Sequence, residues 1–363
     1  MANSTRGFAY EWLVPMLMVA APVGMKIADV IGGESGRGEP ARDLSSMGEA
    51  GVPELEEGKL GLHVIDVGQG DGIVVECPSG DVGVVVDSAD NRDTKGLERF
   101  EAYVTELMDR DSDGRIELVL TTHPHSDHIG ATRWLLETFS PTTYIDNGQK
   151  SDSRTYRELM AALSAAVEKG TRYVVVGPSD ERYSICGEDG VVVEFLVPPG
   201  GYTSCSKPND CSIVTRLDYE STSFILAGDA EEKVEERLLA DPSLRERLDV
   251  DVLKAGHHGS DTSSTLEFLQ AVSPRCIAVS VGDPGVGTNA GYKHPRLSTI
   301  ETLNQLLQSS DPEPDWRAGT VQAYDAGNET WVDAPIREGL RLTPLDGDIV
   351  IESDGESIYC MSN

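Results

Sequence analysis

The chain has 363 residues, enough to bury one large hydrophobic core, and its 62 acidic against 30 basic residues give a formal charge of -32. This charge excludes a broad basic groove for nucleic acid, so any polyanionic substrate must be held by metal ions and a few local Arg or Lys side chains. Only nine of the basic residues are Lys. This acid-rich, Lys-poor balance predicts a protein of a high-salt organism, where roughly molar ions shrink the Debye length to about 3 Å. The alternative is an ordinary acidic bacterial protein.

The first part of the chain, residues 1–31, is an apolar segment that could be a signal or a membrane anchor. Residues 12–23 are apolar apart from two prolines, but a membrane span needs about 20 apolar residues. Glu11 also counts against a signal peptide. Export or anchoring, with a weak membrane association through residues 12–31, and a cytoplasmic location therefore both stay open. Residues 32–58 are rich in Gly, Glu, Ser and Pro and are expected to be a linker.

Between residues 59 and 310, runs of strands followed by helices occur twice, and we expect this range to form one large domain. Strands are expected at residues 60–67, 72–76, 82–86, 116–121, 173–176, 191–197, 212–218, 223–227, 250–254 and 276–281. Helices are expected at residues 98–108, 131–138, 156–168, 231–239, 264–269 and 297–308. This order predicts an α+β fold in which two sheets pack face to face with helices outside. Residues 311–363 are β-like and loop-rich, and are expected to be a C-terminal extension that ends in a hairpin.

The six cysteines show no CxxC spacing typical of a zinc site. A chain of this length does not need a disulfide framework to fold. Cys205 and Cys211 could nevertheless pair across a Pro-containing loop in an oxidising compartment.

A short run after the strand at 116–121 gathers three of the seven histidines and one carboxylate. The four residues are His123, His125, Asp127 and His128. Neutral imidazole and ionised carboxylate are good ligands for divalent transition metals. The ordinary alternative is a solvated His-rich turn. We interpret the run as half of a two-metal hydrolytic site, because other segments offer matching groups.

Four further segments place polar groups at strand ends, where they could converge on the histidine run. Each has an ordinary explanation, namely a hairpin turn, a helix N-cap, a structural histidine pair or a plain turn. Four such coincidences in one chain favour a shared site. The groups are, in chain order, Asp66 with Asp71, Asn209 with Asp210, Asp229, and His257 with His258.

Together these segments resemble the metallo-β-lactamase superfamily, and within it the hydrolase domain of ComEC-type competence proteins. The resemblance covers about residues 60–308 and implies the αββα sandwich of that superfamily. Its motifs are IDVGQGD at 65–71, VD at 86–87, THPHSDHIG at 122–130, NDCS at 209–212, AGD at 227–229, KAGHHGS at 254–260, and Asn289 with HP at 294–295.

The resemblance implies two divalent metal ions, zinc or manganese. His123 and His125 would bind the first ion, at a place where the superfamily more often adds a third histidine. Here that place falls at Asn209 or Asp210, and such oxygen-rich ligation makes manganese plausible beside zinc. Asp127, His128 and His257 would bind the second ion, and Asp229 would bridge the two.

The resemblance also implies catalytic and substrate-binding roles around the ions. Asp127 would serve the reaction as well as the second ion. Asp66 would hold a ligand or the loop beneath the ions, as outer groups do, and His258 would orient substrate or a leaving group. Substrate contacts are expected from Ser260, Lys254 and His294.

These residues predict a metal-dependent hydrolase, foremost a phosphodiesterase or nuclease that acts on DNA through a metal-bridged hydroxide. A hydrolase of small esters, lactones, thioesters or phosphorylated head groups would share the site chemistry, and the acidic surface favours it over long nucleic acid. The third hypothesis is a non-catalytic binding protein that retains metal. The sequence gives no strong signal for a protein partner.

Overall fold

The computed structural model describes residues 51–177, 182–187, 189–202, 205–310 and 316–360. The expected apolar segment at 1–31 and the linker up to residue 50 lie outside these residues. Within the described part of the chain, no helix has both the length and the apolar character needed to cross a membrane.

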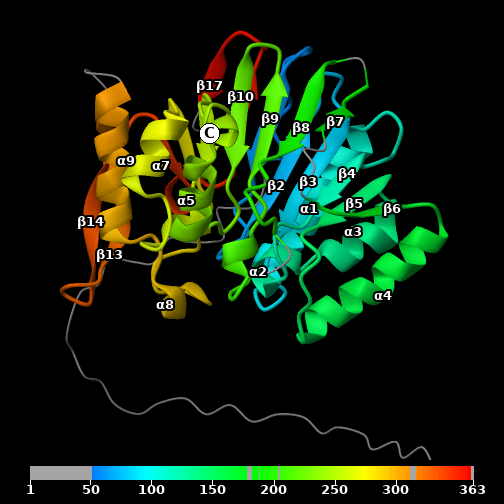
Figure 1. Cartoon of the computed structure of the whole chain (residues 1–363), viewed down its shortest axis with the longest axis horizontal. Coiled ribbons are helices and arrows are strands. Elements are labelled where there is room, and N and C mark those ends of the chain that lie inside the picture. Colours follow the sequence, from blue (N-terminus) through cyan, green and yellow to red (C-terminus); the bar gives the residue numbers. More distant parts are fainter. Residues whose placement is uncertain (1–50, 178–181, 188, 203–204, 311–315, 361–363) are drawn as a thin grey trace, which may run out of the picture. The chain divides into compact units, whose positions relative to one another are not determined.

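The strands form two large sheets and one hairpin (Figure 1). The first sheet has the order β17-β16-β1-β2-β3-β4-β5-β6, and the second has the order β15-β12-β11-β10-β9-β8-β7. The first comprises β1 Leu60–Val64, β2 Gly72–Glu76, β3 Val82–Ser88, β4 Leu118–Leu120, β5 Thr143–Asp146, β6 Arg172–Val175, β16 Ile349–Ser353 and β17 Ile358–Cys360. The second comprises β7 Arg182–Ile185, β8 Val191–Phe195, β9 Thr215–Tyr219, β10 Thr222–Leu226, β11 Val252–Lys254, β12 Cys276–Val279 and β15 Leu340–Leu342.

Helices cover the outer faces of the two sheets (Figure 1). The longer helices are α1 Thr94–Arg110, α3 Thr132–Phe139 and α4 Arg154–Glu168 on one side, and α5 Glu232–Ala240, α7 Leu266–Val272 and α9 Leu297–Ser310 on the other. The short ones are α2 Ser126–Ile129, α6 Pro242–Arg245, α8 Asn289–Tyr292 and α10 Thr343–Asp346. In α4, Leu159, Ala162, Leu163 and Ala166 are buried at helical spacing. The predicted αββα sandwich is confirmed.

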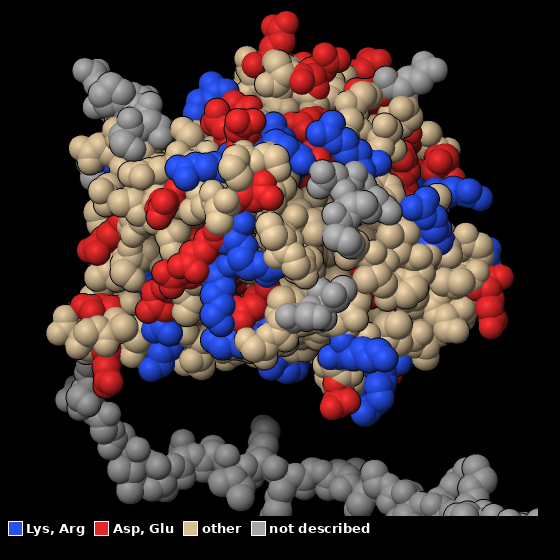
Figure 2. Space-filling view, in the orientation of Figure 1, with Lys and Arg blue, Asp and Glu red and all other residues tan. Residues whose placement is uncertain are grey.

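Acidic and basic side chains share the surface of the described part of the chain. On the face shown in Figure 2 they are interleaved, and no broad basic area is visible there. Many form exposed ion pairs, such as Arg133 with Glu137 at 2.9 Å, and such pairs each contribute at most about 1 kcal/mol. This face therefore offers no extended site for a polyanion.

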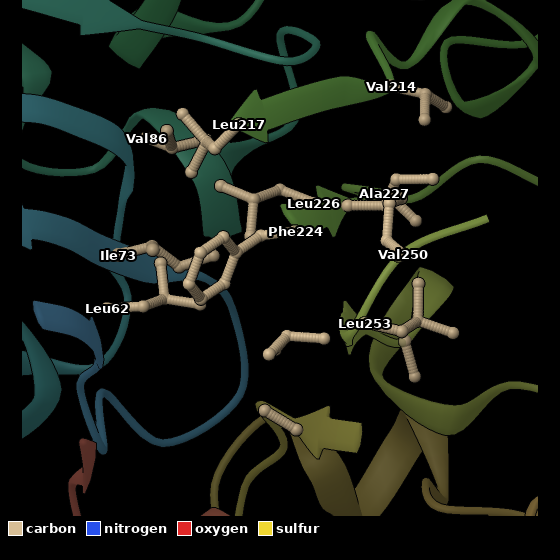
Figure 3. Packing of buried hydrophobic residues seen from close by; sticks show 14 of the residues in the cluster. Leu62, Ile73, Val86, Val214, Leu217, Phe224, Leu226, Ala227, Val250 and Leu253 are labelled. Carbon is tan, nitrogen blue, oxygen red and sulfur yellow. The ribbon is translucent and has the colours of Figure 1, made fainter. Parts of the chain in front are cut away.

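The main core lies between the sheets, because alternate residues of each strand point inward. In β3, Val84 and Val86 belong to the inter-sheet core, while Val85 packs with the outer helices. Figure 3 shows Leu62 and Ile73 of the first sheet close to Phe224 of the second. This two-sided burial explains why the strands read as continuous apolar runs rather than as alternating patterns.

The expected C-terminal extension contributes strands to both sheets. β15 pairs in parallel with β12 in the second sheet. β16 pairs with β1 in the first sheet, and β17 with β16. The expectation of an appendage is therefore corrected: this part of the chain completes the sandwich, and only the hairpin of β13 Trp316–Asp325 and β14 Thr330–Arg337 forms a separate sheet.

All six cysteines are paired in disulfides. The expected Cys205–Cys211 bridge is present. Cys77–Cys186 and Cys276–Cys360 were not expected, and each joins a strand of the first sheet, or its immediate end, to one of the second. A chain of this length was not expected to need such bridges, yet two of them fasten sheets that are otherwise joined mainly by apolar packing.

Candidate metal centre

The predicted metal-binding run lies at the carboxyl end of β4. His123 follows this strand closely, and His125 immediately precedes α2, whose first turn carries Asp127 and His128. The glycine-rich turn before β2 packs beneath α2: a side chain at Gly70 would meet the carbonyl oxygen of Asp127 at 2.4 Å. The adjacent Asp71 N–H donates to that same oxygen (3.1 Å). The glycine thus permits the close backbone approach that holds the run in place.

One group of potential ligands comprises His123, His125 and Asp229. Their ligand atoms all lie within 4.8 Å of one another. His123 Nε2 is 2.9 Å from His125 Nδ1 and 3.7 Å from Asp229 Oδ2. His123 and Asp229 are buried, and His125 is partly exposed. This group could hold one divalent ion with an open side toward solvent.

A second group comprises Asp127, His128 and His258, again with ligand atoms within 4.8 Å of one another. His258 Nε2 lies 4.0 Å from Asp127 Oδ2 and 3.2 Å from Asp229 Oδ1. His128 Nε2 lies 3.3 Å from Asp229 Oδ2. The Asp229 carboxylate therefore faces both groups, which is the position that a bridging ligand requires.

The donor set fits divalent cations, as judged from atoms that the protein leaves without partners. His128 Nε2, His258 Nε2 and Asp229 Oδ1 are buried and accept or donate no hydrogen bond among the described residues. A buried polar atom left unsatisfied costs about 1–3 kcal/mol. Three such atoms that point at one another are accounted for by metal coordination, which uses their lone pairs.

Two buried carboxylates lie behind the ligands, and the sequence reasoning named both without assigning either of them a role. Asp87 accepts a hydrogen bond from His128 Nδ1 (2.7 Å) and two from Thr122. Asp71 forms a buried ion pair with Lys254 and lies 3.4 Å from His258 Nδ1. Both residues stand in motifs that carried the family resemblance, and their position at a strand end was the available signal. Such contacts fix the tautomer in which Nε2 is free to bind metal.

Electrostatics favour the metal-binding forms of two of the ligands, Asp229 and His123. Burial alone would raise the pKa of Asp229, but His128, His258 and His257 hold it well below its ordinary value. Burial lowers the pKa of His123 well below that of free imidazole. At neutral pH Asp229 is therefore ionised and His123 neutral, the forms in which both groups coordinate metal.

The structure reverses the expected roles of the two adjacent histidines. Both have left-handed backbone conformations, with φ of 48° at His257 and 54° at His258, so their side chains diverge. His258 joins the second group, whereas His257 is in none of the three groups of potential ligands found among the described residues, the third being Asp71, His128 and Asp229. His257 Nε2 lies 3.7 Å from Asp229 Oδ2, and its Nδ1 is 3.0 Å from Thr262 Oγ1. The expectation that His257 completes the second site is corrected accordingly.

Of the two candidates for an extra ligand, only Asn209 lies beside the centre. Its Nδ2 is 3.2 Å from His257 Nε2 and 3.2 Å from Glu231 Oε1. Asp210 points elsewhere, because its Oδ2 accepts from Ser206 Oγ and from Lys233 Nζ, each at 3.1 Å. The expectation that Asp210 is a ligand is therefore corrected.

Two residues that were expected to contact substrate instead contact other residues of the protein. Lys254 is fully buried and is held by Asp71 and by the Gly228 carbonyl oxygen (3.1 Å). Ser260 is 2% exposed, and its hydroxyl contacts Thr262 Oγ1 at 3.0 Å. Both expectations are corrected: these residues support the ligand-bearing backbone. His294 remains beside the centre, with its ring centroid 5.4 Å from that of His257.

Asp66 takes the second of its two expected roles, because it holds the glycine-rich loop rather than a metal ligand. Its backbone N–H donates to Asp348 Oδ1 (2.9 Å), and its own Oδ1 accepts from the Gly68 N–H (3.3 Å). Burial, together with the carboxylates of Asp348 and Asp283, raises its pKa to about 7. Asp66 is thus a largely buried carboxyl group in the turn before β2, and the contacts to metal ligands come from Asp87 and Asp71 instead.

Replacing Asp66 by Asn should stabilise the protein at about pH 8 by on the order of 2–4 kcal/mol. Folding raises the pKa of Asp66 from 3.8 to about 7, so the folded protein holds this proton more tightly than the unfolded chain does. The stabilisation from this protonated carboxyl group is complete only below pH 3.8 and is lost as the pH rises through about 7. The advantage of Asp66→Asn should therefore grow from pH 4 to pH 8. Denaturant unfolding across this range measures it, with Asp109→Asn on the exposed face of α1 as the control. A difference that does not vary with pH would contradict the assignment.

Comparison with known proteins shows which family of proteins the chain matches. The model of the metallo-beta-lactamase superfamily matches residues 65–282. The chain is 25% identical to ComE operon protein 3 of Bacillus subtilis over 256 residues, which cover 67% of this chain and 30% of that protein. It is also 25% identical to Recombination protein 2 of Haemophilus influenzae over 250 residues, which cover 67% and 26%. The chain thus spans less than a third of the length of these relatives.

Among solved structures, the metallo-beta-lactamase fold protein YhfI of Bacillus subtilis is similar with a TM-score of 0.40 and 12% identity, over 69% of this chain and 93% of that one.

Proposed function

The chain belongs to the metallo-beta-lactamase superfamily, and we propose that it is a metal-dependent phosphodiesterase that cuts DNA. The observation that carries the proposal is the position of Asp229, whose two carboxylate oxygens face two separate groups of ligands. A pair of cations bridged by one carboxylate suits phosphodiester hydrolysis, because one ion can serve the attacking oxygen and the other the leaving oxygen.

Divalent ions bound by these residues would supply Lewis acidity and an activated water. The protein itself contributes orientation and charge. Asp87 keeps the Nδ1 proton on His128, and the Ser280 carbonyl oxygen accepts from His258 Nδ1 (3.0 Å). Ser212 Oγ accepts the Asp229 backbone N–H (2.9 Å), which fixes the bridging carboxylate at the end of β10. The buried ligands thus enter the reaction already aligned.

We propose DNA as the substrate because of the names that the similar proteins carry. Their names concern competence and recombination, and one of them, competence protein ComA of Neisseria gonorrhoeae, is 30% identical over 181 residues, which cover 50% of this chain and 21% of that protein. The whole proteins are much longer, so the activity proposed for this chain concerns the hydrolytic step alone. Zinc and manganese both suit a site of imidazole and carboxylate ligands with an amide nearby.

We also propose that the protein acts in an oxidising compartment of a high-salt organism. Three disulfides with no free cysteine are typical of exported proteins, because cytosolic thiols are kept reduced. The net charge of -32 favours high salt, which screens its self-repulsion.

Protein purified in roughly molar KCl should contain close to two divalent ions per chain and should cleave single-stranded DNA and bis-p-nitrophenyl phosphate. Activity should vanish with a chelator and return with manganese or zinc, because the ligands are left without a cation. Elemental analysis and a substrate panel measured at low and at roughly molar salt test this. Asp127→Ala should abolish cleavage, whereas Asp152→Ala, at an exposed position, should not. Turnover confined to carboxylic esters or lactones would contradict the nuclease proposal, and full metal without any turnover would favour a binding protein.

A further inference from the structure

Next to the metal centre, three aromatic and three basic side chains form a group that we call the rim cluster. Tyr324 lies in its middle. Lys293 Nζ is 4.6 Å from the centroid of the Tyr324 ring, Arg296 Cζ is 5.2 Å from it, and the Trp331 ring centroid is 5.4 Å from it. The members of the rim cluster are Arg92, Tyr292, Lys293, Arg296, Tyr324 and Trp331.

Backbone hydrogen bonds hold the rim cluster against the site. The Tyr324 N–H donates to the Pro295 carbonyl oxygen (2.9 Å), which ties the β13–β14 hairpin to the segment after α8. The Arg296 N–H donates to the Gly259 carbonyl oxygen (2.9 Å), next to His258. The same short segment therefore binds the hairpin on one side and the ligand-bearing loop on the other.

Ring contacts lead from the rim cluster to the bridging carboxylate. The Tyr292 ring centroid lies 6.2 Å from that of His294, which lies 5.4 Å from that of His257. His257 Nε2 in turn lies 3.7 Å from Asp229 Oδ2. Two ring contacts, through His294 and His257, thus separate the exposed Tyr292 from the metal centre.

The cluster concentrates positive charge in a strongly acidic protein. Arg92 pairs with Asp90 at 2.7 Å and also reaches the Tyr292 hydroxyl (3.3 Å). Within the described part of the chain, Arg296 forms one long ion pair of 3.7 Å, with the half-exposed Asp261, and also donates to the Tyr292 carbonyl oxygen (3.3 Å). Lys293 donates to the Tyr324 hydroxyl (3.0 Å) and has no carboxylate within 4.0 Å among the described residues. An ammonium group with unused hydrogen-bond donors can bind a phosphate group.

Packing of the hairpin does not explain these features. Tyr324 and Trp331 are directly opposite each other in the β13–β14 ladder, and such a cross-strand pair stabilises a hairpin by itself. The stability of the hairpin requires neither the two cations over Tyr324 nor Tyr292, which is 37% exposed. An exposed ring beside cations, at the margin of a hydrolytic site, is the arrangement that holds single-stranded nucleic acid.

We propose that the rim cluster binds single-stranded DNA beside the bond to be cut, an inference that rests on the proposed function. Tyr292 stacks on an unpaired base, and Lys293 and Arg296 bind the flanking phosphates. Duplex DNA is disfavoured because its bases are already stacked and because its higher charge density needs a broader basic surface.

Tyr292→Ala should raise KM for a single-stranded oligonucleotide of about ten thymidines and leave kcat within about twofold. The ratio of kcat/KM for this oligonucleotide to kcat/KM for bis-p-nitrophenyl phosphate should fall about 5- to 30-fold, the effect expected for loss of one base stack. Lys293→Gln should lower the same ratio in low salt and less so in roughly molar salt, because phosphate contacts are screened.

Tyr359→Ala is the matched control, because Tyr359 is as exposed as Tyr292 and has a lysine, Lys59, 4.5 Å from its ring centroid, as Tyr324 has Lys293. It should leave the ratio unchanged. Fluorescence anisotropy of the labelled oligonucleotide with Asp229→Asn protein measures binding without cleavage, so the inference is tested even where turnover fails. A ratio unaffected by Tyr292→Ala, or tighter binding of the matching duplex, would overturn the rim cluster assignment. Absence of any phosphodiester turnover by the wild type, with Tyr292-dependent binding intact, would instead overturn the proposed function alone.

Discussion

Replacing Asp229 by Asn should lower the rate of phosphodiester hydrolysis by about 10³-fold or more and should strip the protein of much of its bound metal. Asn offers one oxygen and no charge, whereas both carboxylate oxygens of Asp229 face ligand groups. The change also places a neutral amide beside His128 and His258. Burial lowers the pKa of both histidines, and the Asp229 charge, which raises it, would be lost.

Elemental analysis and kcat/KM with bis-p-nitrophenyl phosphate measure the two effects of Asp229→Asn. Asp152→Asn, an exposed position near the start of α4, should change neither. The backbone hydrogen bond from Asp229 to Ser212 does not depend on the carboxylate, so far-ultraviolet circular dichroism should be unchanged. An Asp229→Asn protein with full metal content and activity within tenfold of the wild type would refute the bridging role.

Removing the Cys77–Cys186 disulfide by replacing both cysteines with Ser should lower the free energy of unfolding by about 3–5 kcal/mol. The bridge spans 109 residues of sequence, and a cross-link of this span removes much of the conformational entropy of the unfolded chain. It also fastens the end of β2 to the end of β7, so its loss frees one edge of the sandwich. The loss is a large fraction of the stability of a typical domain.

The Cys205–Cys211 pair serves as the internal comparison, because it spans only 6 residues and its removal should cost about 2 kcal/mol. Equilibrium unfolding in guanidinium chloride, without reductant, measures both double Ser variants. Thiol titration of the denatured wild type should find no free thiol before reduction. Equal losses for the two variants would argue against an entropic origin of the difference.

Most of the fold could be predicted from the sequence, because its long helices carry apolar periodicity and its central strands are continuous apolar runs. The range 72–76 was expected as a strand and is β2, and 156–168 was expected as a helix and lies within α4. The sequence reasoning missed β5, which has four residues. So short a parallel strand is stabilised by its neighbours β4 and β6 rather than by its own propensity.

The site could be predicted less completely, because neighbouring residues in a turn can face opposite directions. His257 and His258 have the same side chain, and only their left-handed backbone decides which one reaches the second group. Lys254 ends a central strand that is buried on both faces, so its charge required the buried partner Asp71. Cysteine pairs at separations of 109 and 84 residues cannot be deduced from spacing.

The pairing of β1 with β16 sets the order in which the chain can complete its fold. Val64 at the start of the domain is opposite Ile349 near its end, and Cys360 is bonded to Cys276. Until the last strands emerge from the ribosome, β1 has one exposed edge, which invites non-native pairing. The first sheet can therefore close on this side of β1 only after β16 has been synthesised, whatever the order in which the other strands form.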